Sequence, residues 1–502
     1  MPSRYKQAIC VSLVALGLVS WRSTLSAQAL VTQYLAFQLF TDVRESAELR
    51  SAFPPPARDT AGTVAELVNA IGRVGDSTRK LAFVVGPLSF DHGDDQVRNV
   101  IRDSFAVALE KNVAVGFHID DSMFWGRLGY LNTPENLEWL DWNQTVNTGR
   151  RVDWSSTPLQ IMPQLCINSP AVQDEVRMRA ALIGEAVKQG LDMLQAANKP
   201  ELFAGVIAGW ETQIGRDFAT GSHLGYCALT NMGFSAENPP ADMNEARANA
   251  TQEFVELWTH SLSDAGVPEA RIFSHTAFLA RAVFDSVQSS RPGYFPASYI
   301  EAVNFAPPRV SFGSRHYAGF TTYPQLGALS EIHGEREKNS NPPWASAEGA
   351  AIDAAAADRG SAGESMEAYL GNLFNHGAVL VNIFGWGVGD ANNPFRRAAE
   401  NASAIAAYQK FLRGDGLSEV SVEQAAEEVA RKPPNENTPS HGPTFDFFSK
   451  LQRLQSRLPA YFSSHGPGEV GALFERLGRQ MDAKRFTEAE ATVDALLKIV
   501  EK

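Results

Sequence analysis

The stretch AGVIAGWETQIG, residues 204–215, is an apolar run that ends in Trp210 and the carboxylate of Glu211. Its continuous apolar half is typical of a strand that is buried on both faces, as in a parallel sheet. Amphipathic segments with helical spacing flank it at residues 172–198 and 243–266. A strand between two helices is the repeating unit of an α/β fold.

The same unit recurs over residues 34–413. Besides 204–210, we expect strands at residues 34–41, 81–86, 113–119, 271–276, 319–323, 344–348 and 379–386. We expect helices at residues 61–75, 94–112, 172–198, 243–266, 279–290, 325–335, 365–376 and 396–413. Eight strands, each followed by a helix, predict a (β/α)8 TIM barrel. An open doubly wound sheet is the alternative, because residues 299–305 compete as a strand.

The composition is that of a folded globular protein, with 44% hydrophobic and 20% charged residues in a chain of 502. Residues 1–29 indicate a secretory signal peptide, since Arg4 and Lys6 precede an apolar run and Ala27-Gln28-Ala29 offers a cleavage site. We therefore expect a secreted or periplasmic protein without a membrane span. The net charge of −13 argues against nucleic acid as a partner. Oligomeric state is left open.

Three segments follow the signal peptide. Residues 30–415 form the expected catalytic barrel, residues 416–443 a polar, proline-containing linker, and residues 444–502 a small helical appendage. Within the appendage we expect helices at 445–458, 468–481 and 487–500. The last of these resembles half of a tetratricopeptide-type hairpin, but a single unit favours a small helical cap on the barrel over a repeat array.

The longest loops are those that follow strands. The loop after the third expected strand occupies residues 120–171, and the one after the fourth is also long. In a barrel these loops gather on the C-terminal face, where active sites lie. We therefore expect the substrate to bind at that face.

Two glutamates stand at the ends of the fourth and seventh expected strands, Glu211 in GVIAGWETQIG and Glu348 in PPWASAEGA. Carboxylates there project toward one centre, which suits cleavage of a glycosidic bond by an acid and a nucleophile. A structural salt bridge is the plainer interpretation of either glutamate alone.

These positions resemble those of the clan A (β/α)8 glycoside hydrolases, a retaining superfamily. Its acid/base glutamate ends strand 4, its nucleophile ends strand 7 and a tryptophan ends strand 8, which correspond to Glu211, Glu348 and Trp386. The resemblance implies a retaining glycosidase with a carbohydrate substrate and no cofactor. Trp210 stands where the superfamily usually has an asparagine, and the family within the clan is not identified.

Other residues near the expected rim are candidates for sugar binding. Indole faces stack on pyranose rings, and acidic, histidine and tyrosine side chains hydrogen-bond sugar hydroxyls. The candidates are Trp125, Trp210, Trp344, Trp386, His118, Asp120, Asp121, His275 and Tyr323. Asp120 and Asp121 equally suit capping of the loop that follows them.

Two further hypotheses remain open. One is a non-catalytic glycan-binding barrel, and the other is a metal-dependent hydrolase with His118, Asp120 and the pair Asp91-His92 as ligands.

Outside the signal peptide the chain has only Cys166 and Cys227, which in an oxidising compartment are a candidate disulfide or two separate thiols.

Overall fold

The computed structural model describes residues 31–41, 60–145, 147, 149–152, 159–215, 222–276, 315–322, 328–349, 365–387, 394–419, 450, 454, 457, 461, 468–482 and 486–500. The expected signal peptide, the expected helix at 279–290, the competing strand at 299–305 and most of the expected linker lie outside these residues. So does Tyr323.

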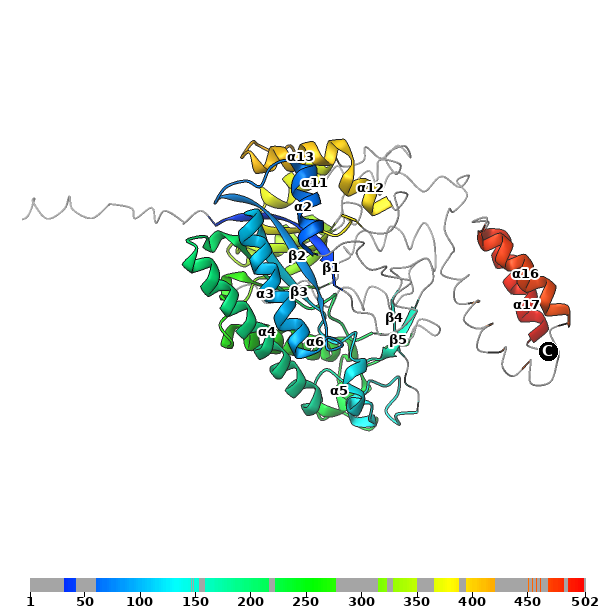
Figure 1. The fold of residues 1–502 in the computed structure, drawn as a ribbon. Helices are drawn as coiled ribbons and strands as arrows, with labels where there is room; N and C mark the ends of the chain where they lie inside the picture. The colour runs from blue at the N-terminus through cyan, green and yellow to red at the C-terminus, as the bar shows by residue number, and fades with distance from the viewer. Residues whose placement is uncertain are drawn as a thin grey trace, which may run out of the picture.

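Eight parallel strands form the centre of the molecule (Figure 1). They are β1 (Gln33–Phe40), β2 (Arg79–Leu88), β3 (Ala114–Ile119), β6 (Phe203–Ala208), β7 (Ile272–Ser274), β8 (Gly319–Thr322), β9 (Trp344–Gly349) and β10 (Ala378–Ile383). Their order across the sheet is β7-β6-β3-β2-β1-β10-β9-β8. Every neighbouring pair in this order is parallel.

Backbone hydrogen bonds join the two ends of this sheet. The amide of Ser274 donates to the carbonyl of Tyr317 at 3.0 Å, and the amide of Thr321 donates to the carbonyl of Thr276 at 3.0 Å. Parallel bridges pair Phe273 with Tyr317 and Thr276 with Phe320. The strands therefore form a (β/α)8 TIM barrel, and the expected fold class is confirmed.

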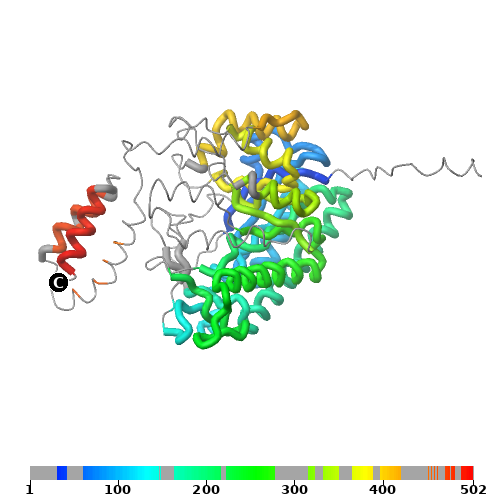
Figure 2. Tube along the Cα trace, turned by 180° about the vertical axis from the view of Figure 1, so that it is seen from behind, coloured from blue at the N-terminus to red at the C-terminus, as the bar shows by residue number. Residues whose placement is uncertain are grey.

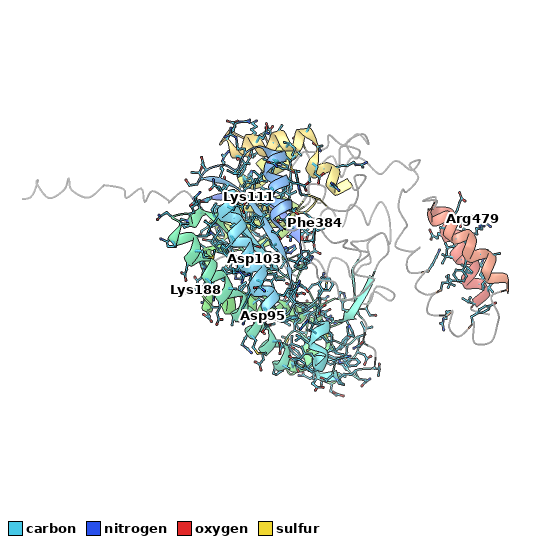
Figure 3. The ribbon with its side chains drawn as sticks, viewed as in Figure 1. Asp95, Asp103, Lys111, Lys188, Phe384 and Arg479 are labelled. Atoms are coloured by element: carbon cyan, nitrogen blue, oxygen red, sulfur yellow. The ribbon has the colours of Figure 1, made fainter. Side chains whose placement is uncertain are left out.

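Helices cover the outside of the barrel (Figures 1 and 2). The longer ones are α2 (Thr60–Ile71), α3 (Asp94–Lys111), α4 (Pro170–Ala196), α6 (Met243–Asp264), α9 (Ala328–Lys338), α11 (Met366–Phe374) and α13 (Ala402–Leu412). Shorter ones are α5 (Tyr226–Asn231), α12 (Pro394–Glu400) and the 3-10 turns η1 (Gly126–Leu131), η2 (Pro134–Asn136), η3 (Pro200–Leu202) and η4 (Glu269–Arg271). Charged side chains such as Asp95 and Asp103 line the outer surface of α3 (Figure 3).

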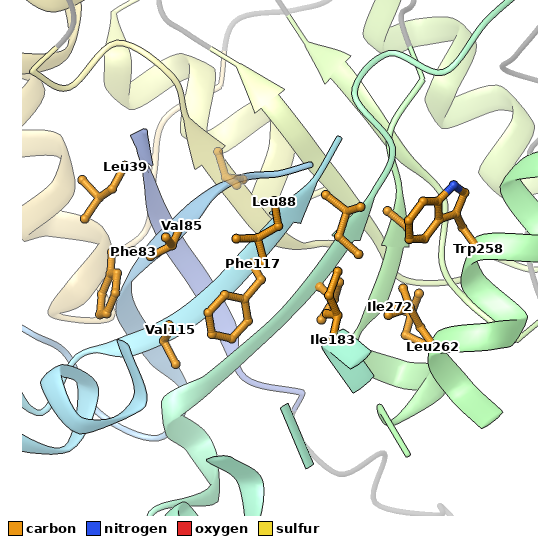
Figure 4. Packing of buried hydrophobic residues seen from close by; sticks show 14 of the residues in the cluster. Leu39, Phe83, Val85, Leu88, Val115, Phe117, Ile183, Trp258, Leu262 and Ile272 are labelled. Carbon is orange, nitrogen blue, oxygen red and sulfur yellow. The ribbon is translucent and has the colours of Figure 1, made fainter. Parts of the chain in front are cut away.

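Side chains alternate between two apolar layers along each strand. On β1, Leu35 and Phe37 belong to the cluster that packs against the helices, whereas Tyr34 and Ala36 belong to the smaller cluster inside the barrel. Figure 4 shows the outer layer, where Phe83, Phe117 and Ile183 meet between strands and helices. The inner layer is small, so polar side chains can share the barrel interior.

All eight expected strands are present, with bounds that differ by one to three residues. The segment expected as one helix at 396–413 is two helices, because the side chain of Asn401 accepts a hydrogen bond from the Ala404 amide and starts α13. The loop after β3 also contains an antiparallel hairpin that the sequence pattern did not predict. It pairs β4 (Gly149–Val152) with β5 (Leu159–Pro163).

The C-terminal part contains α16 (Gly468–Asp482) and α17 (Phe486–Val500). These two helices share their own apolar cluster, which includes Val470, Val493 and Leu496 and no barrel residue. The expected helices at 468–481 and 487–500 are therefore confirmed. Among the described residues, no helix is both long and apolar enough to cross a bilayer.

Candidate active site

Glu211 is presented by a left-handed turn at the carboxyl end of β6. Gly209 has a φ of +107° and Glu211 a φ of +54°, a region that non-glycine residues rarely adopt. The turn is held against β7, because the amide of Thr212 donates to the carbonyl of His275 at 3.2 Å. A half-buried carboxylate in a constrained backbone conformation is typical of a functional position.

Thr321 on β8 hydrogen-bonds this carboxylate from the far side of β7. Its hydroxyl donates to Oε1 of Glu211 at 2.7 Å. Thr321 is also the register partner of Glu348 on β9. Since paired residues of parallel strands project to the same face, Glu348 projects toward the barrel interior beside Thr321.

A β-bulge in β9 gives Glu348 this orientation. Ser346 and Gly349 both occupy positions that face the helices. They pair with Val381 and Ile383, two residues of β10 that face the helices. Two residues lie between Ser346 and Gly349, whereas one residue lies between Val381 and Ile383. The register of β9 therefore shifts here against both β10 and β8. The bulge turns Glu348 inward, as bulges next to active sites often do.

A chain of buried polar side chains continues from Glu211 into the barrel. Nε2 of His275 lies 2.9 Å from the Thr321 hydroxyl, and Nδ1 of His275 lies 3.0 Å from Nε2 of His118. Nδ1 of His118 lies 2.9 Å from Oε1 of Gln38. Both histidines have no exposed surface, and burial is the main cause that lowers the pKa of His118 well below its ordinary value. The next cause is the neighbouring His275.

Three aromatic rings at strand ends surround the same region. The ring of Phe40, at the end of β1, lies 6.3 Å from that of Trp210 and 5.4 Å from that of Phe384. Figure 3 marks Phe384, which directly follows β10. Trp210 stacks on His118 with 4.2 Å between centroids. Phe40 and Phe384 are not among the predicted site residues, although both are aromatic residues near the ends of expected strands.

The structure places three of the predicted tryptophans away from Glu211. Trp386 packs edge-on against Phe37, an outward residue of β1, at 5.2 Å, so it faces the helix layer. Trp344 begins β9 at the end of the barrel away from Glu348, and its indole N–H donates to the carbonyl of His376. Trp125 is fully buried and donates to the carbonyl of Pro163. Trp210, which is itself buried, is the predicted tryptophan that lies next to Glu211.

The polar candidates after β3 also have structural roles. The carboxylate of Asp120 accepts hydrogen bonds from the amides of Met123 at 2.9 Å and Phe124 at 2.8 Å, so it caps the loop. Asp121 is fully buried beside it. His118 and His275 lie inside the barrel with no exposed surface, and the hydroxyl of Thr321 lies between His275 and Glu211.

Asp91 and His92, two of the candidate metal ligands, hydrogen-bond to backbone amides instead. Nδ1 of His92 accepts from the amide of Ser89 at 3.1 Å, and Asp91 accepts from the amide of Arg127 at 3.2 Å. Within the described part of the chain, no three histidine, cysteine, aspartate or glutamate side chains are grouped as a metal would require.

Cys166 and Cys227 are buried and free, so the candidate disulfide is not formed in this structure. The two thiols are close, because Nδ2 of Asn231 lies 3.4 Å from Sγ of Cys166 and 4.0 Å from Sγ of Cys227. Burial raises the pKa of the Cys166 thiol. Glu138 lies with them and accepts a hydrogen bond from the Cys227 amide.

Comparison with known proteins adds a likeness of fold. No family model matches the chain. No curated protein matches it either. Among solved structures, a beta-galactosidase from the Antarctic haloarchaeon Halorubrum lacusprofundi is 12% identical with a TM-score of 0.38, over 85% of this chain and 65% of the galactosidase. This chain thus spans slightly under two thirds of that protein.

Two further solved structures illustrate the range of the matches. The catalytic domain of a beta-amylase from Paenibacillus polymyxa is 8% identical with a TM-score of 0.48, over 79% of this chain and 100% of that chain. A D-psicose 3-epimerase from Clostridium cellulolyticum H10 is 9% identical with a TM-score of 0.31, over 80% and 99%. Glycoside hydrolases and a sugar epimerase thus both occur among the matches, and likenesses this distant carry no information on activity.

Proposed function

We propose that this protein is a glycoside hydrolase that cleaves an oligosaccharide or polysaccharide with retention of configuration. Glu211 is the general acid/base and Glu348 is the nucleophile. The observation that carries the proposal is the link through Thr321, which hydrogen-bonds Glu211 and pairs in register with Glu348 at the carboxyl ends of the strands. Catalytic groups of TIM barrels lie at these ends.

In the first step, protonated Glu211 donates its proton to the glycosidic oxygen while a carboxylate oxygen of Glu348 attacks the anomeric carbon. The leaving group departs and a glycosyl ester of Glu348 remains. In the second step, Glu211 takes a proton from water, and the water oxygen attacks the anomeric carbon and releases Glu348. A proton returns to Glu211 in each cycle.

Phe40 and Phe384 supply the apolar surface for the sugar, and Trp210 lies buried beside Phe40. Phe40 and Phe384 are half-buried, so each keeps part of its ring exposed at the strand ends. Aromatic faces suit the C–H faces of a pyranose ring. The signal-peptide pattern of residues 1–29 supports a secreted or periplasmic location, where polysaccharides are substrates.

A panel of aryl glycosides and polysaccharides tests the proposal. We expect wild-type protein to hydrolyse at least one of them, and Glu348→Gln to reduce that turnover to background while the sugar still binds. Glu211→Gln should lower kcat/KM by about 10²–10⁴-fold for substrates with poor leaving groups. Glu185→Gln, at an exposed position of α4, is the matched control and should leave turnover unchanged.

Three results would contradict the proposal. Binding of a glycan without turnover by the wild-type protein would identify a glycan-binding barrel. Turnover that survives in Glu348→Gln would remove Glu348 from the reaction. For the stereochemistry, the expected result is that NMR shows the first-formed sugar with the anomeric configuration of the substrate, and the opposite anomer would establish inversion.

A further inference from the structure

The buried chain that ends at Glu211 has a definite direction, which Asn382 on β10 sets. Nδ2 of Asn382 lies 2.9 Å from the carbonyl of Ala347, which can only accept a hydrogen bond. The same nitrogen lies 2.9 Å from Oε1 of Gln38, so this oxygen is also an acceptor. Gln38 turns its own amide nitrogen toward three backbone carbonyls at 3.4 Å.

The orientation of Gln38 places a proton on His118. Because Oε1 of Gln38 only accepts, Nδ1 of His118 must donate to it across 2.9 Å. In a neutral imidazole the other nitrogen, Nε2, is then bare and accepts from Nδ1 of His275. When Glu211 is protonated, its carboxyl O–H donates to Oγ of Thr321, and the Thr321 hydroxyl donates to the bare Nε2 of His275. When Glu211 is a carboxylate, the Thr321 hydroxyl donates to it instead.

The surroundings of His118 also fit its protonated form. Nε2 lies 3.0 Å from the carbonyl of Gly209, and a second N–H on the ring would donate to it. The indole of Trp210 stacks on the imidazole at 4.2 Å with 20° between the planes. An aromatic face stabilises a cation placed against it. His118 therefore has an acceptor at each nitrogen and a π face for the ring.

We propose that Thr321, His275 and His118 form a proton relay in which His118 is a second site for the proton of Glu211. The carboxyl O–H of Glu211 breaks and its proton moves to Oγ of Thr321, whose own proton moves to Nε2 of His275. The proton on Nδ1 of His275 then moves to Nε2 of His118. One proton is transferred in total, which leaves Glu211 as a carboxylate, His275 neutral with the proton on its other nitrogen, and His118 as an imidazolium.

The role of the relay in catalysis rests on the proposed function: while the proton lies on His118, Glu211 is a carboxylate, and return of the same proton along the relay restores the acid form that the first step needs. Burial disfavours the charged imidazolium, so the resting proton belongs on the outer side of the relay. The ionisable groups around the relay are Glu211 and His275 in direct contact, Glu348 in register with Thr321, and Asp120 and Asp121 beyond the end of β3.

His275 reports the state of the relay. Its proton is on Nδ1 when Glu211 is protonated, and on Nε2 when Glu211 is a carboxylate that accepts from Thr321. Full-length protein with ¹⁵N-histidine and ¹³C-carboxyl glutamate allows both groups to be followed by NMR during a pH titration. The signals are assigned from their loss in Glu211→Gln and His275→Gln.

We expect the His275 tautomer to switch at the pH where Glu211 ionises. The switch should be lost in Thr321→Val, which keeps the shape but has no hydroxyl, and kept in Thr321→Ser. In Glu211→Gln the tautomer should not change with pH. A switch that persists unchanged in Thr321→Val, or a wild-type His275 that stays constant while Glu211 titrates, would overturn the relay.

The result is independent of substrate, so the two proposals can fail separately. A linked switch in a protein that hydrolyses no glycoside would support the relay and contradict the proposed function. Turnover of a glycoside without a linked switch of the His275 tautomer would support the proposed function and contradict the relay. If Thr321→Val does not fold, the comparison of wild type with Glu211→Gln still decides, because only the wild type contains the group whose ionisation drives the switch.

Discussion

Glu138 is a fully buried carboxyl group beneath the long loop that follows β3. Burial is the main cause that raises its pKa, to about 7, although hydrogen bonds from Cys166 and from the Cys227 amide partly offset it. The protonated form is therefore favoured in the folded protein. Since the ordinary pKa is 4.5, the folded state binds the extra proton between about pH 4.5 and 7, and stability falls as pH rises through this range.

Glu138→Gln keeps the shape of the side chain and an oxygen acceptor for the Cys227 amide, without an ionisable group. We expect the wild-type free energy of unfolding to fall by about 3 kcal/mol relative to the variant between pH 4.5 and 8. Urea unfolding at both pH values measures this difference. Identical pH dependence in wild type and Glu138→Gln would show that Glu138 does not titrate in this range.

Phe384 and Trp386 are close in sequence and have different surroundings. Phe384 contacts Phe40 near Trp210, whereas Trp386 packs against Phe37 under the helices. We expect Phe384→Leu to raise KM by roughly two- to tenfold and to change the melting temperature little. Trp386→Leu is the matched control and should lower the melting temperature with KM unchanged. Steady-state kinetics and thermal unfolding of both variants decide the assignment, and the reverse pattern would restore Trp386 as the sugar platform.

Only part of the candidate site was predictable at the level of residues. Glu211 and Glu348 were predicted because each follows an apolar run, and the end of a run is visible in sequence. Trp344 begins such a run, so it lies at the opposite end of the barrel. Trp386 follows a run, but the direction of its side chain depends on the turn after β10. Thr321 was missed because its importance comes from contacts with residues distant in sequence.

The turn at the end of β6 presents Glu211 to the site. Gly209 has a φ of +107°, and a Cβ there would collide with the hydroxyl of Thr212 and lie 3.2 Å from the carbonyl of His275. Alanine at this position must therefore displace the turn that presents Glu211.

Gly209→Ala should lower stability by about 1–3 kcal/mol and reduce kcat/KM as well. Gly233→Ala is the matched control, because Gly233 also has a positive φ, +88°, but nothing lies within 4 Å of its Cβ position. We expect the control to lose stability by about 1 kcal/mol and to keep its kcat/KM. Chemical unfolding and kinetics of both variants test this, and a Gly209→Ala enzyme with wild-type kcat/KM would show that the turn does not position Glu211.

The strands were predictable because each is a short apolar run between amphipathic segments, and burial on both faces requires such runs in a parallel barrel. The β4–β5 hairpin was not, because Gly149–Val152 is the short polar segment GRRV. The bulge in β9 could not be predicted from the sequence either. It depends on how Ser346 and Gly349 align with both neighbouring strands, and no local pattern in WASAEG encodes this.

At the scale of the whole molecule, barrel closure brings residues from distant parts of the chain together. β1 pairs with β10, and β7 is joined to β8, so the ends of the first and last strands become neighbours. This arrangement places Phe40 beside Phe384 and Thr321 beside Glu211. The expected division into barrel, linker and helical appendage remains a prediction, supported by the separate apolar cluster of α16 and α17.

In the proposed reaction, Glu348 forms a covalent bond to the sugar. The most direct test uses an activated 2-deoxy-2-fluoro analogue of the aryl glycoside that the panel identifies. The enzyme releases such a sugar slowly, so the glycosyl-enzyme accumulates. Peptide mass spectrometry of the trapped protein should find one added sugar, attached to Glu348. A sugar attached to another residue, or no attachment in a protein that turns over the parent glycoside, would contradict the account.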